Sequence, residues 1–299
     1  MKKLIATSCI TLLAVTFFIY TSIPIALADA IEGETIVTLG EDLSQSQRAT
    51  VLEDMGITDE DEVEIIYVTN EEEHNYLGDY IPASQIGTNA ISSARITLRN
   101  DNTGVAVTTN NINYITGAMY TNALATAGVS GAEIYATAPF TVSGTGALTG
   151  IMKAYEASTG ETIDEEVKQA ANEEMVVTAE LAEDEDIDED EAVDFMNQIK
   201  ERIDQENPQS AEDVRDLISR LADELGISLS QDQLEQLVSL FNNLRNLNID
   251  WGKVTDTIDA TRDWISDFAE SEEGQNVIQS IIGFFQSIWE WFLSVFSNN

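Results

Sequence analysis

The fold of the first half of the chain is decided by residues 105–136, which read VAVTTNNINYITGAMYTNALATAGVSGAEIYA. A β-branched run, Val105–Thr109, comes first, and a helical pattern over Thr116–Ala127 follows it and ends at Gly128. The stretch returns to a strand pattern at Ala132–Ala136. Strand, helix and strand in this order predict a β-α-β unit.

A second β-α-β unit precedes this one. It has a strand at Thr35–Leu39, a helix closed by Gly56 and a strand at Val63–Val68. We expect the two units to share one sheet, with helices covering at least one of its faces. Together they predict a single layered domain over residues 29–160.

The two units share a faint sequence echo. Val37-Thr38 in the first corresponds to Val107-Thr108 in the second, and Glu64-Ile65 corresponds to Glu133-Ile134. Gaps are needed to align these positions, so the echo by itself is a weak signal.

Three further elements complete the predicted domain. A short helix is expected over Asn70–Leu77, with Asn70 as its cap. The run Arg95–Leu98 is predicted to form a hairpin with Val105–Thr109, because Asn, Asp and Gly residues separate them. The pattern over Ala147–Ala157 predicts the last helix of the domain.

The second half of the chain has a different character. From Glu161 onward there is no convincing strand, and the spacing of apolar residues predicts helices over residues 161–299. Within this part, the acidic block at residues 183–191 is interpreted as a solvated linker. The clearest helix start is Ser230, which stands at capping-box spacing from Gln233. The predicted fold class is α+β: an N-terminal layered α/β domain built from two β-α-β units, followed by an all-α helical bundle.

The first residues of the chain predict export. Lys2 and Lys3 form a basic start, residues 4–20 are apolar with small polar interruptions, and the small-x-small pattern Ala26-Leu27-Ala28 follows Pro24. We expect residues 1–28 to be a signal peptide that is cleaved between Ala28 and Asp29, which directs the protein to the extracellular space or the cell envelope. An uncleaved anchor is the alternative, since the length of the apolar run just permits it. Cys9 lies inside this segment, so the mature chain would contain no cysteine.

The charge of the chain restricts its partners. It contains 54 acidic and 14 basic residues among 299, for a formal net charge of -40. Such a surface repels nucleic acids and anionic lipids, so we expect no nucleic-acid partner. The acidity is interpreted mainly as solvation of an exported protein. Weak binding of divalent cations is the second interpretation.

The most apolar segment after the signal is a predicted helix over residues 276–296. Its polar residues fall three or four apart and leave most of the circumference apolar. Three places of burial remain open: the helical bundle itself, a partner or second copy, and a membrane. The residues predicted to make partner or membrane contact are Phe284, Phe285, Ile288, Trp289, Trp291, Phe292 and Phe296.

No motif in the chain assembles a reactive centre. The single histidine, His74, follows three glutamates and is more typical of an exposed helix face than of a metal site. In the acidic block, Glu189 stands where a calcium-binding EF-hand loop needs glycine. The glycine-rich run at residues 144–150 departs from the dinucleotide-binding spacing, although its helix N-terminus could hold an anion. We therefore expect no catalytic residue, no metal site and no cofactor.

Several short motifs resemble one known family. They are Ile36–Ser44, Glu73–Gly78, Gln85–Gly87, Tyr135–Phe140, Gly144–Gly150, Gln236–Phe241 and Ile249–Gly252. In these motifs the chain resembles the YpuA-like secreted proteins of Gram-positive bacteria over essentially its whole length. The resemblance implies an exported protein and supplies no catalytic residues.

These observations favour a non-enzymatic protein that acts by binding outside the membrane, with an envelope protein or a second copy as its partner. The first alternative is a secreted hydrolase that uses two carboxylates, which would have to lie about 5–10 Å apart in a cleft. The second alternative is a divalent-cation-binding protein of the envelope.

Overall fold

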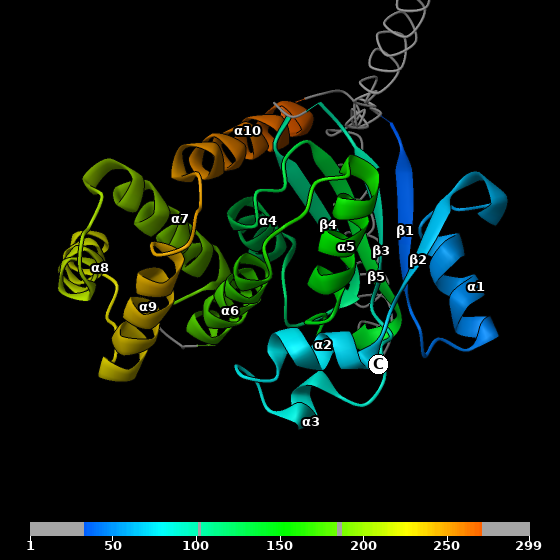
Figure 1. Cartoon of the computed structure of the whole chain (residues 1–299), viewed down its shortest axis with the longest axis horizontal. Coiled ribbons are helices and arrows are strands. Elements are labelled where there is room, and N and C mark those ends of the chain that lie inside the picture. Colours follow the sequence, from blue (N-terminus) through cyan, green and yellow to red (C-terminus); the bar gives the residue numbers. More distant parts are fainter. Residues whose placement is uncertain (1–32, 101–102, 184–186, 271–299) are drawn as a thin grey trace, which may run out of the picture.

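A computed structural model describes residues 33–100, 103–183 and 187–270 of the chain. The strands are β1 (Thr35–Gly40), β2 (Glu64–Val68), β3 (Ser93–Leu98), β4 (Val105–Ile112) and β5 (Ala132–Val142). The helices between and after them are α1 (Gln45–Asp54), α2 (Asn70–Leu77), α3 (Ala83–Ile86), α4 (Gly117–Thr126), α5 (Ala147–Thr159), α6 (Glu165–Ala182), α7 (Glu189–Glu206), α8 (Ala211–Leu225), α9 (Gln231–Leu244) and α10 (Trp251–Glu270). The predicted α+β class is confirmed (Figure 1).

The five strands form one sheet in the order β2-β1-β3-β5-β4. Both predicted β-α-β units are present: β1 pairs with β2 and β4 pairs with β5, each in parallel. The sequence echo has a structural counterpart, because Val37 pairs with Ile65 in the first unit as Val107 pairs with Ile134 in the second. The two units are joined by β3, which runs antiparallel to both β1 and β5.

The predicted hairpin between β3 and β4 is wrong. β5 lies between these two strands and pairs with both of them. The connection at residues 99–104 is long enough to pass over one strand, because strands lie about 5 Å apart and six residues reach about 20 Å. The residues between β3 and β4 have the composition of a hairpin turn. Helix α4 nevertheless carries the chain back so that β5 pairs in parallel with β4 and occupies the place beside it.

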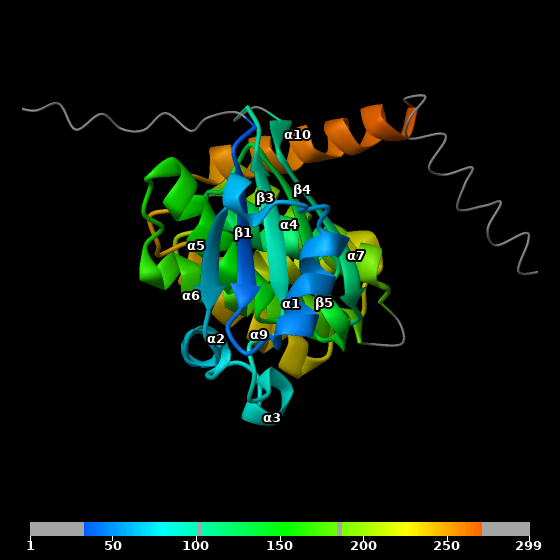
Figure 2. The same ribbon diagram turned by 90° about the vertical axis from the view of Figure 1, so that its right-hand side faces the viewer.

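Helices cover both faces of the sheet, as Figures 1 and 2 show. On one face α1 packs through Val51, Leu52 and Met55 onto Val37 and Leu39 of β1. The other face carries a larger core that contains α4, α5 and α6. That core extends beyond the predicted domain boundary, since Met175 and Val176 of α6 belong to it. The boundary at residues 160 and 161 stays a prediction.

Every described element after β5 is helical, in agreement with the predicted bundle. These helices enclose a second core, which includes Phe195, Ile199 and Phe241. The predicted capping box of Ser230 and Gln233 is confirmed at the start of α9.

Two local boundaries differ from the sequence-based expectation. Helix α7 begins at Glu189 with Asp188 as its cap, so the last three residues of the predicted acidic linker form its first turn. Helix α2 is capped by Thr69 rather than by Asn70, because the Thr69 hydroxyl accepts a hydrogen bond from the backbone N–H of Glu72 at 3.1 Å.

Two predicted segments lie outside the described residues. They are the signal peptide at residues 1–28, with its cleavage site at Ala28 and Asp29, and the apolar helix at residues 276–296 with its seven predicted contact residues. Among the helices that the structure describes, none combines the length and the apolar character needed to cross a membrane.

Candidate functional site

Helix α10 lies against β4, one of the two edge strands of the sheet. The Thr261 hydroxyl oxygen accepts a hydrogen bond from the backbone N–H of Val105 at 2.8 Å and donates to the Thr257 carbonyl oxygen at 2.8 Å. Thr121 of α4 donates its hydroxyl to the Val105 carbonyl oxygen at 3.1 Å. A Cβ atom at Gly104 would clash with the Thr261 backbone, so glycine permits the close approach. Two helices thereby cover backbone groups that an edge strand leaves unpaired.

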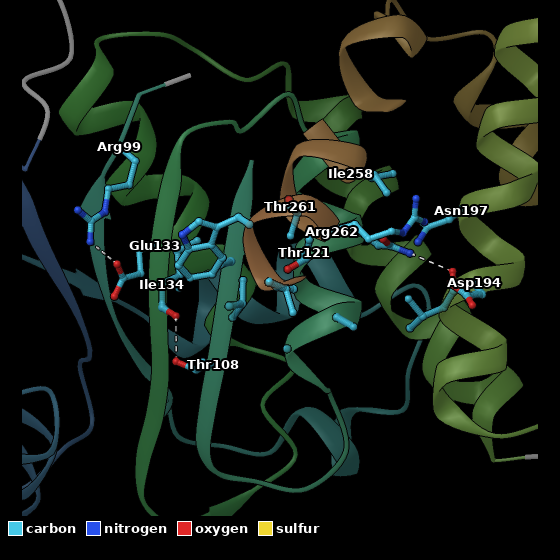
Figure 3. Close-up of a pocket in the computed structure, with 18 residues that line it drawn as sticks. Arg99, Thr108, Thr121, Glu133, Ile134, Asp194, Asn197, Ile258, Thr261 and Arg262 are labelled. Carbon is cyan, nitrogen blue, oxygen red and sulfur yellow. Dashed lines mark hydrogen bonds and ion pairs between the residues drawn. The ribbon is translucent and has the colours of Figure 1, made fainter. Parts of the chain in front are cut away.

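A groove with a volume of about 800 Å³ lies beside this contact (Figure 3). Its volume falls within the range of ligand sites, roughly 300–1,000 Å³. Apolar side chains from five elements line it: Ala106 and Val107 of β4, Ala118 of α4, Ile134 of β5, Val193 of α7, and Ile258, Trp264 and Ile265 of α10. Trp264 is 38% exposed and Ile265 is 54% exposed, so the α10 wall presents apolar surface to solvent.

Charged side chains stand on opposite sides of the groove. Arg99 forms an ion pair with Glu133 on the sheet side. On the helical side the Arg262 side chain extends toward Asp194 (Figure 3), and its Nη1 atom also lies 2.9 Å from Oδ1 of Asp259. The lining therefore contains two arginines and two acids, although the chain as a whole carries a net charge of -40.

One lining side chain has an unused hydrogen-bonding atom. Oδ1 of Asn197 in α7 is buried and accepts no hydrogen bond from the described residues. A buried acceptor without a partner costs about 1–3 kcal/mol, so a ligand donor placed here would be favoured. Apolar walls with a few polar groups of this kind suit a ligand that is mainly apolar and carries polar ends.

A buried polar network lies behind the groove. Nζ of Lys200 in α7 lies 2.5 Å from Oε1 of Glu174 in α6, and both side chains are fully buried. Lys200 also donates to the carbonyl oxygen of Asn122, a groove residue, at 3.0 Å. Thr126 donates its hydroxyl to Oε2 of Glu174 at 2.6 Å. Burial lowers the pKa of Lys200, and the Glu174 carboxylate opposes that shift. The network ties α4, α6 and α7 together.

A second notable carboxyl group lies at the N-terminus of α5. The Glu73 side chain is buried, and a Cβ atom at Gly146 would clash with it. Nδ2 of Asn70 donates to its Oε2 atom at 3.3 Å. Burial raises the pKa of Glu73 to about 7, and the nearby carboxylates of Asp42 and Glu72 raise it as well. The helix N-terminus that was predicted to suit an anion therefore faces the chain's own carboxyl group.

Glu72 and Glu73 are shifted in opposite directions. The pKa of Glu72 is lowered, because hydrogen bonds from Lys153 and Thr69 outweigh the effect of burial. Two carboxyl groups with separated pKa values are typical of acid–base pairs. Neither of them lines the groove, however, and the carboxylate hydrolase therefore stays a prediction without an assigned cleft.

The other sequence candidates lie apart from the groove. Nε2 of His74 lies 2.9 Å from the Gly87 carbonyl oxygen, a contact that ties α2 to the loop after α3. In the described ranges, no group of three or more His, Cys, Asp or Glu side chains is arranged to hold a metal ion.

Sequence reasoning missed the groove. Its residues come from five elements spread between Arg99 and Ile265, so no local motif contains it. One available signal was Trp264 beside Ile265, an apolar pair in a segment of α10 otherwise rich in charge.

Comparison with known proteins places the chain in a family. A family model described as "Protein of unknown function (DUF1002)" matches residues 39–261. "Uncharacterized protein YpuA" of Bacillus subtilis (strain 168) is 48% identical over 273 residues, which cover 91% of this chain and 93% of that protein. No solved structure matches the chain. The resemblance drawn from the short motifs is thus confirmed, and the chain belongs to the DUF1002 family.

Proposed function

We propose that the protein is exported and acts outside the membrane by binding a mainly apolar partner in the groove between α10 and β4, without catalysing a reaction. The observation that carries this proposal is the groove itself: about 800 Å³, apolar walls from five elements, and a buried acceptor on Asn197 without a hydrogen-bond donor among the described residues.

The charge distribution supports a mainly apolar partner. Two of the 14 basic residues of the chain, Arg99 and Arg262, line the groove together with two acids, Glu133 and Asp194. The positive and negative charges of the lining are equal in number, so a partner in the groove meets less net negative charge than it would on the rest of the chain. Because each arginine stands beside an acid, the lining does not select a strongly basic ligand.

Export is supported by the sequence. A cleavable signal has a basic start, an apolar run and a small-x-small pattern in this order, and the chain has them at Lys2 and Lys3, at residues 4–20 and at residues 26–28. Detection of the mature N-terminus at Asp29 in the culture fluid or the envelope fraction would test this part of the proposal.

Site-specific photocrosslinking tests the binding role. A benzophenone amino acid replaces Ala118, an exposed residue that lines the groove, in the full chain expressed in its host. We expect an adduct with a second molecule, which mass spectrometry identifies. The same probe at Gln231, an exposed residue of α9 outside the groove, is the matched control.

A charge in the apolar wall provides the specificity test. Ile265→Glu should remove the adduct at Ala118, because a carboxylate in the wall opposes an apolar partner. Tyr67→Glu, at another exposed large hydrophobic residue, should leave it unchanged. Equal labelling from Ala118 and Gln231, or an adduct that survives Ile265→Glu, would contradict the proposal.

A further inference from the structure

The second edge strand of the sheet is β2, which pairs with β1 alone among the described strands (Figure 1). Its ladder shows which way its backbone groups point. Gly40 pairs with Val68, and the N–H of Glu41 donates to the Val68 carbonyl oxygen at 2.8 Å. Because consecutive residues of a strand direct their backbone groups to opposite sides, Val68 faces β1, whereas Ile65 and Tyr67 face outward.

This outer edge is open in the described part of the chain. The N–H and C=O groups of Ile65 and the N–H of Tyr67 have no hydrogen-bond partner among the described residues. The Tyr67 carbonyl oxygen accepts a hydrogen bond from Nζ of Lys153 at 2.8 Å, in an exposed contact. The edge at β4 differs, since α4 and α10 cover its backbone groups at Val105.

We propose that β2 binds an extended peptide segment in which apolar and basic residues alternate, and that this segment adds a strand to the sheet. In this mode of recognition, main-chain hydrogen bonds to an exposed edge give affinity, and alternate side chains give specificity. The site lies at the opposite edge of the sheet from the groove, so it does not depend on the proposed function.

One face of β2 suits apolar side chains. Ile65 packs against the core under α1, and Tyr67, on the same face, is 45% exposed. Arg48 of α1 orients the Tyr67 ring, because its guanidinium donates to the Tyr67 hydroxyl and its Cζ atom lies 5.6 Å from the ring centroid. Apolar side chains of an added strand would pack on Ile65 and on the exposed ring.

The other face suits basic side chains. Glu64 is an exposed residue of β2, and Glu62 is an exposed residue just before the strand. Neither forms an ion pair among the described residues, whereas Glu72 is paired with Lys153. A lysine or arginine of the added strand would compensate the charge of Glu64.

Charge also favours a basic peptide over a second copy of the chain. Each copy carries 54 acidic and 14 basic residues, so two copies repel each other. Pairing of two β2 edges would also bring the Glu64 side chains of both copies to the same junction. Self-association is therefore one of the results that the test must distinguish.

Binding of a synthetic probe tests the proposal. The probe is a peptide of alternating valine and lysine with blocked ends and a fluorescent label, and its affinity for the full mature chain is measured by fluorescence anisotropy. Two further probes carry N-methyl groups, on the valine nitrogens in one and on the lysine nitrogens in the other. Because alternate N–H groups of a strand point to opposite sides, only one of these sets can donate to β2.

We expect one methylated probe to bind about tenfold or more weakly than the parent, and the other to bind much as the parent does. A probe of alternating valine and glutamate should not bind. Equal weakening by both methylations would indicate attraction to the acids without strand pairing, and would overturn the proposal. Absence of binding by the parent probe would overturn it as well.

Two variants of the chain locate the site. Ile65→Pro removes an outward N–H and no bond to β1, so the circular dichroism should be unchanged. Glu64→Lys reverses the charge beside the added strand. Each should weaken binding of the parent probe about tenfold or more. Asp216→Lys, at an exposed residue of α8, and Ile265→Glu, in the groove, are controls that should leave binding unchanged.

The remaining results also decide the matter. Equal effects of Glu64→Lys and Asp216→Lys would contradict a site at β2. If Ile65→Pro alters the circular dichroism, the two methylated probes still separate strand pairing from charge attraction. A chain that sediments as a dimer without probe, and as a monomer after Ile65→Pro, would overturn the proposal in favour of a second copy.

Discussion

The buried pair of Lys200 and Glu174 allows the sharpest test of the structure. Lys200→Met removes the ammonium group but keeps most of the length of the side chain. The Glu174 carboxylate stays buried, with the Thr126 hydroxyl at 2.6 Å as its remaining partner. Removal of one member of a buried ion pair costs about 3–5 kcal/mol. The Asn122 carbonyl oxygen also loses the hydrogen bond from Lys200, and that loss is part of the cost of this substitution.

The double variant Lys200→Met/Glu174→Gln removes both charges. Because no uncompensated charge then remains, we expect it to recover most of the lost stability and to fall within about 1–2 kcal/mol of the unmodified chain. The free energy of unfolding is measured by urea denaturation followed by circular dichroism. Glu174→Gln is measured as the second single variant. The stability cost of the double variant minus the sum of the costs of the two single variants gives the coupling energy of the pair.

Lys153→Met is the matched control, since Lys153 pairs with Glu72 at 2.6 Å but both side chains are about one-third exposed. An exposed pair contributes about 0–1 kcal/mol. A cost below about 1 kcal/mol for Lys200→Met, or costs that simply add in the double variant, would refute the reasoning.

Three further predictions concern burial and close contact. The folded pKa of Glu73 is about 7 and its ordinary value is 4.5, so the folded state binds a proton more tightly than the unfolded state. The contribution of Glu73 to stability should therefore fall by about 3 kcal/mol as the pH rises between these values. Urea midpoints across this window should show a shallower decline for Glu73→Gln than for the unmodified chain. Thr261→Val leaves the Val105 N–H without its acceptor and should cost about 1–3 kcal/mol, whereas Thr261→Ser should cost much less, and a difference near zero would contradict the contact. Gly146→Ala should lower the melting temperature, because its methyl group would meet the Glu73 carboxyl, and the loss should shrink in a Glu73→Ala background.

The family assignment and the order of elements were accessible from the sequence because both depend on local signals. Apolar periodicity and glycine stops located α4 and the strands on either side of it, and capping residues located the start of α9. The echo between the two β-α-β units was faint in the sequence. The structure gives it a meaning, because Val37 pairs with Ile65 and Val107 pairs with Ile134, so that the two valines occupy equivalent positions in their units.

The sequence by itself determined the α+β class, the two β-α-β units and the helical second half, since each follows from the pattern of neighbouring residues. Only the tertiary structure decided that β5 separates β3 from β4, that Lys200 reaches Glu174, and that α10 closes one side of a groove on the sheet edge. The physical reason is distance along the chain. Contacts between residues as remote as Val105 and Thr261 are selected by the packing of whole elements, and no local propensity encodes them.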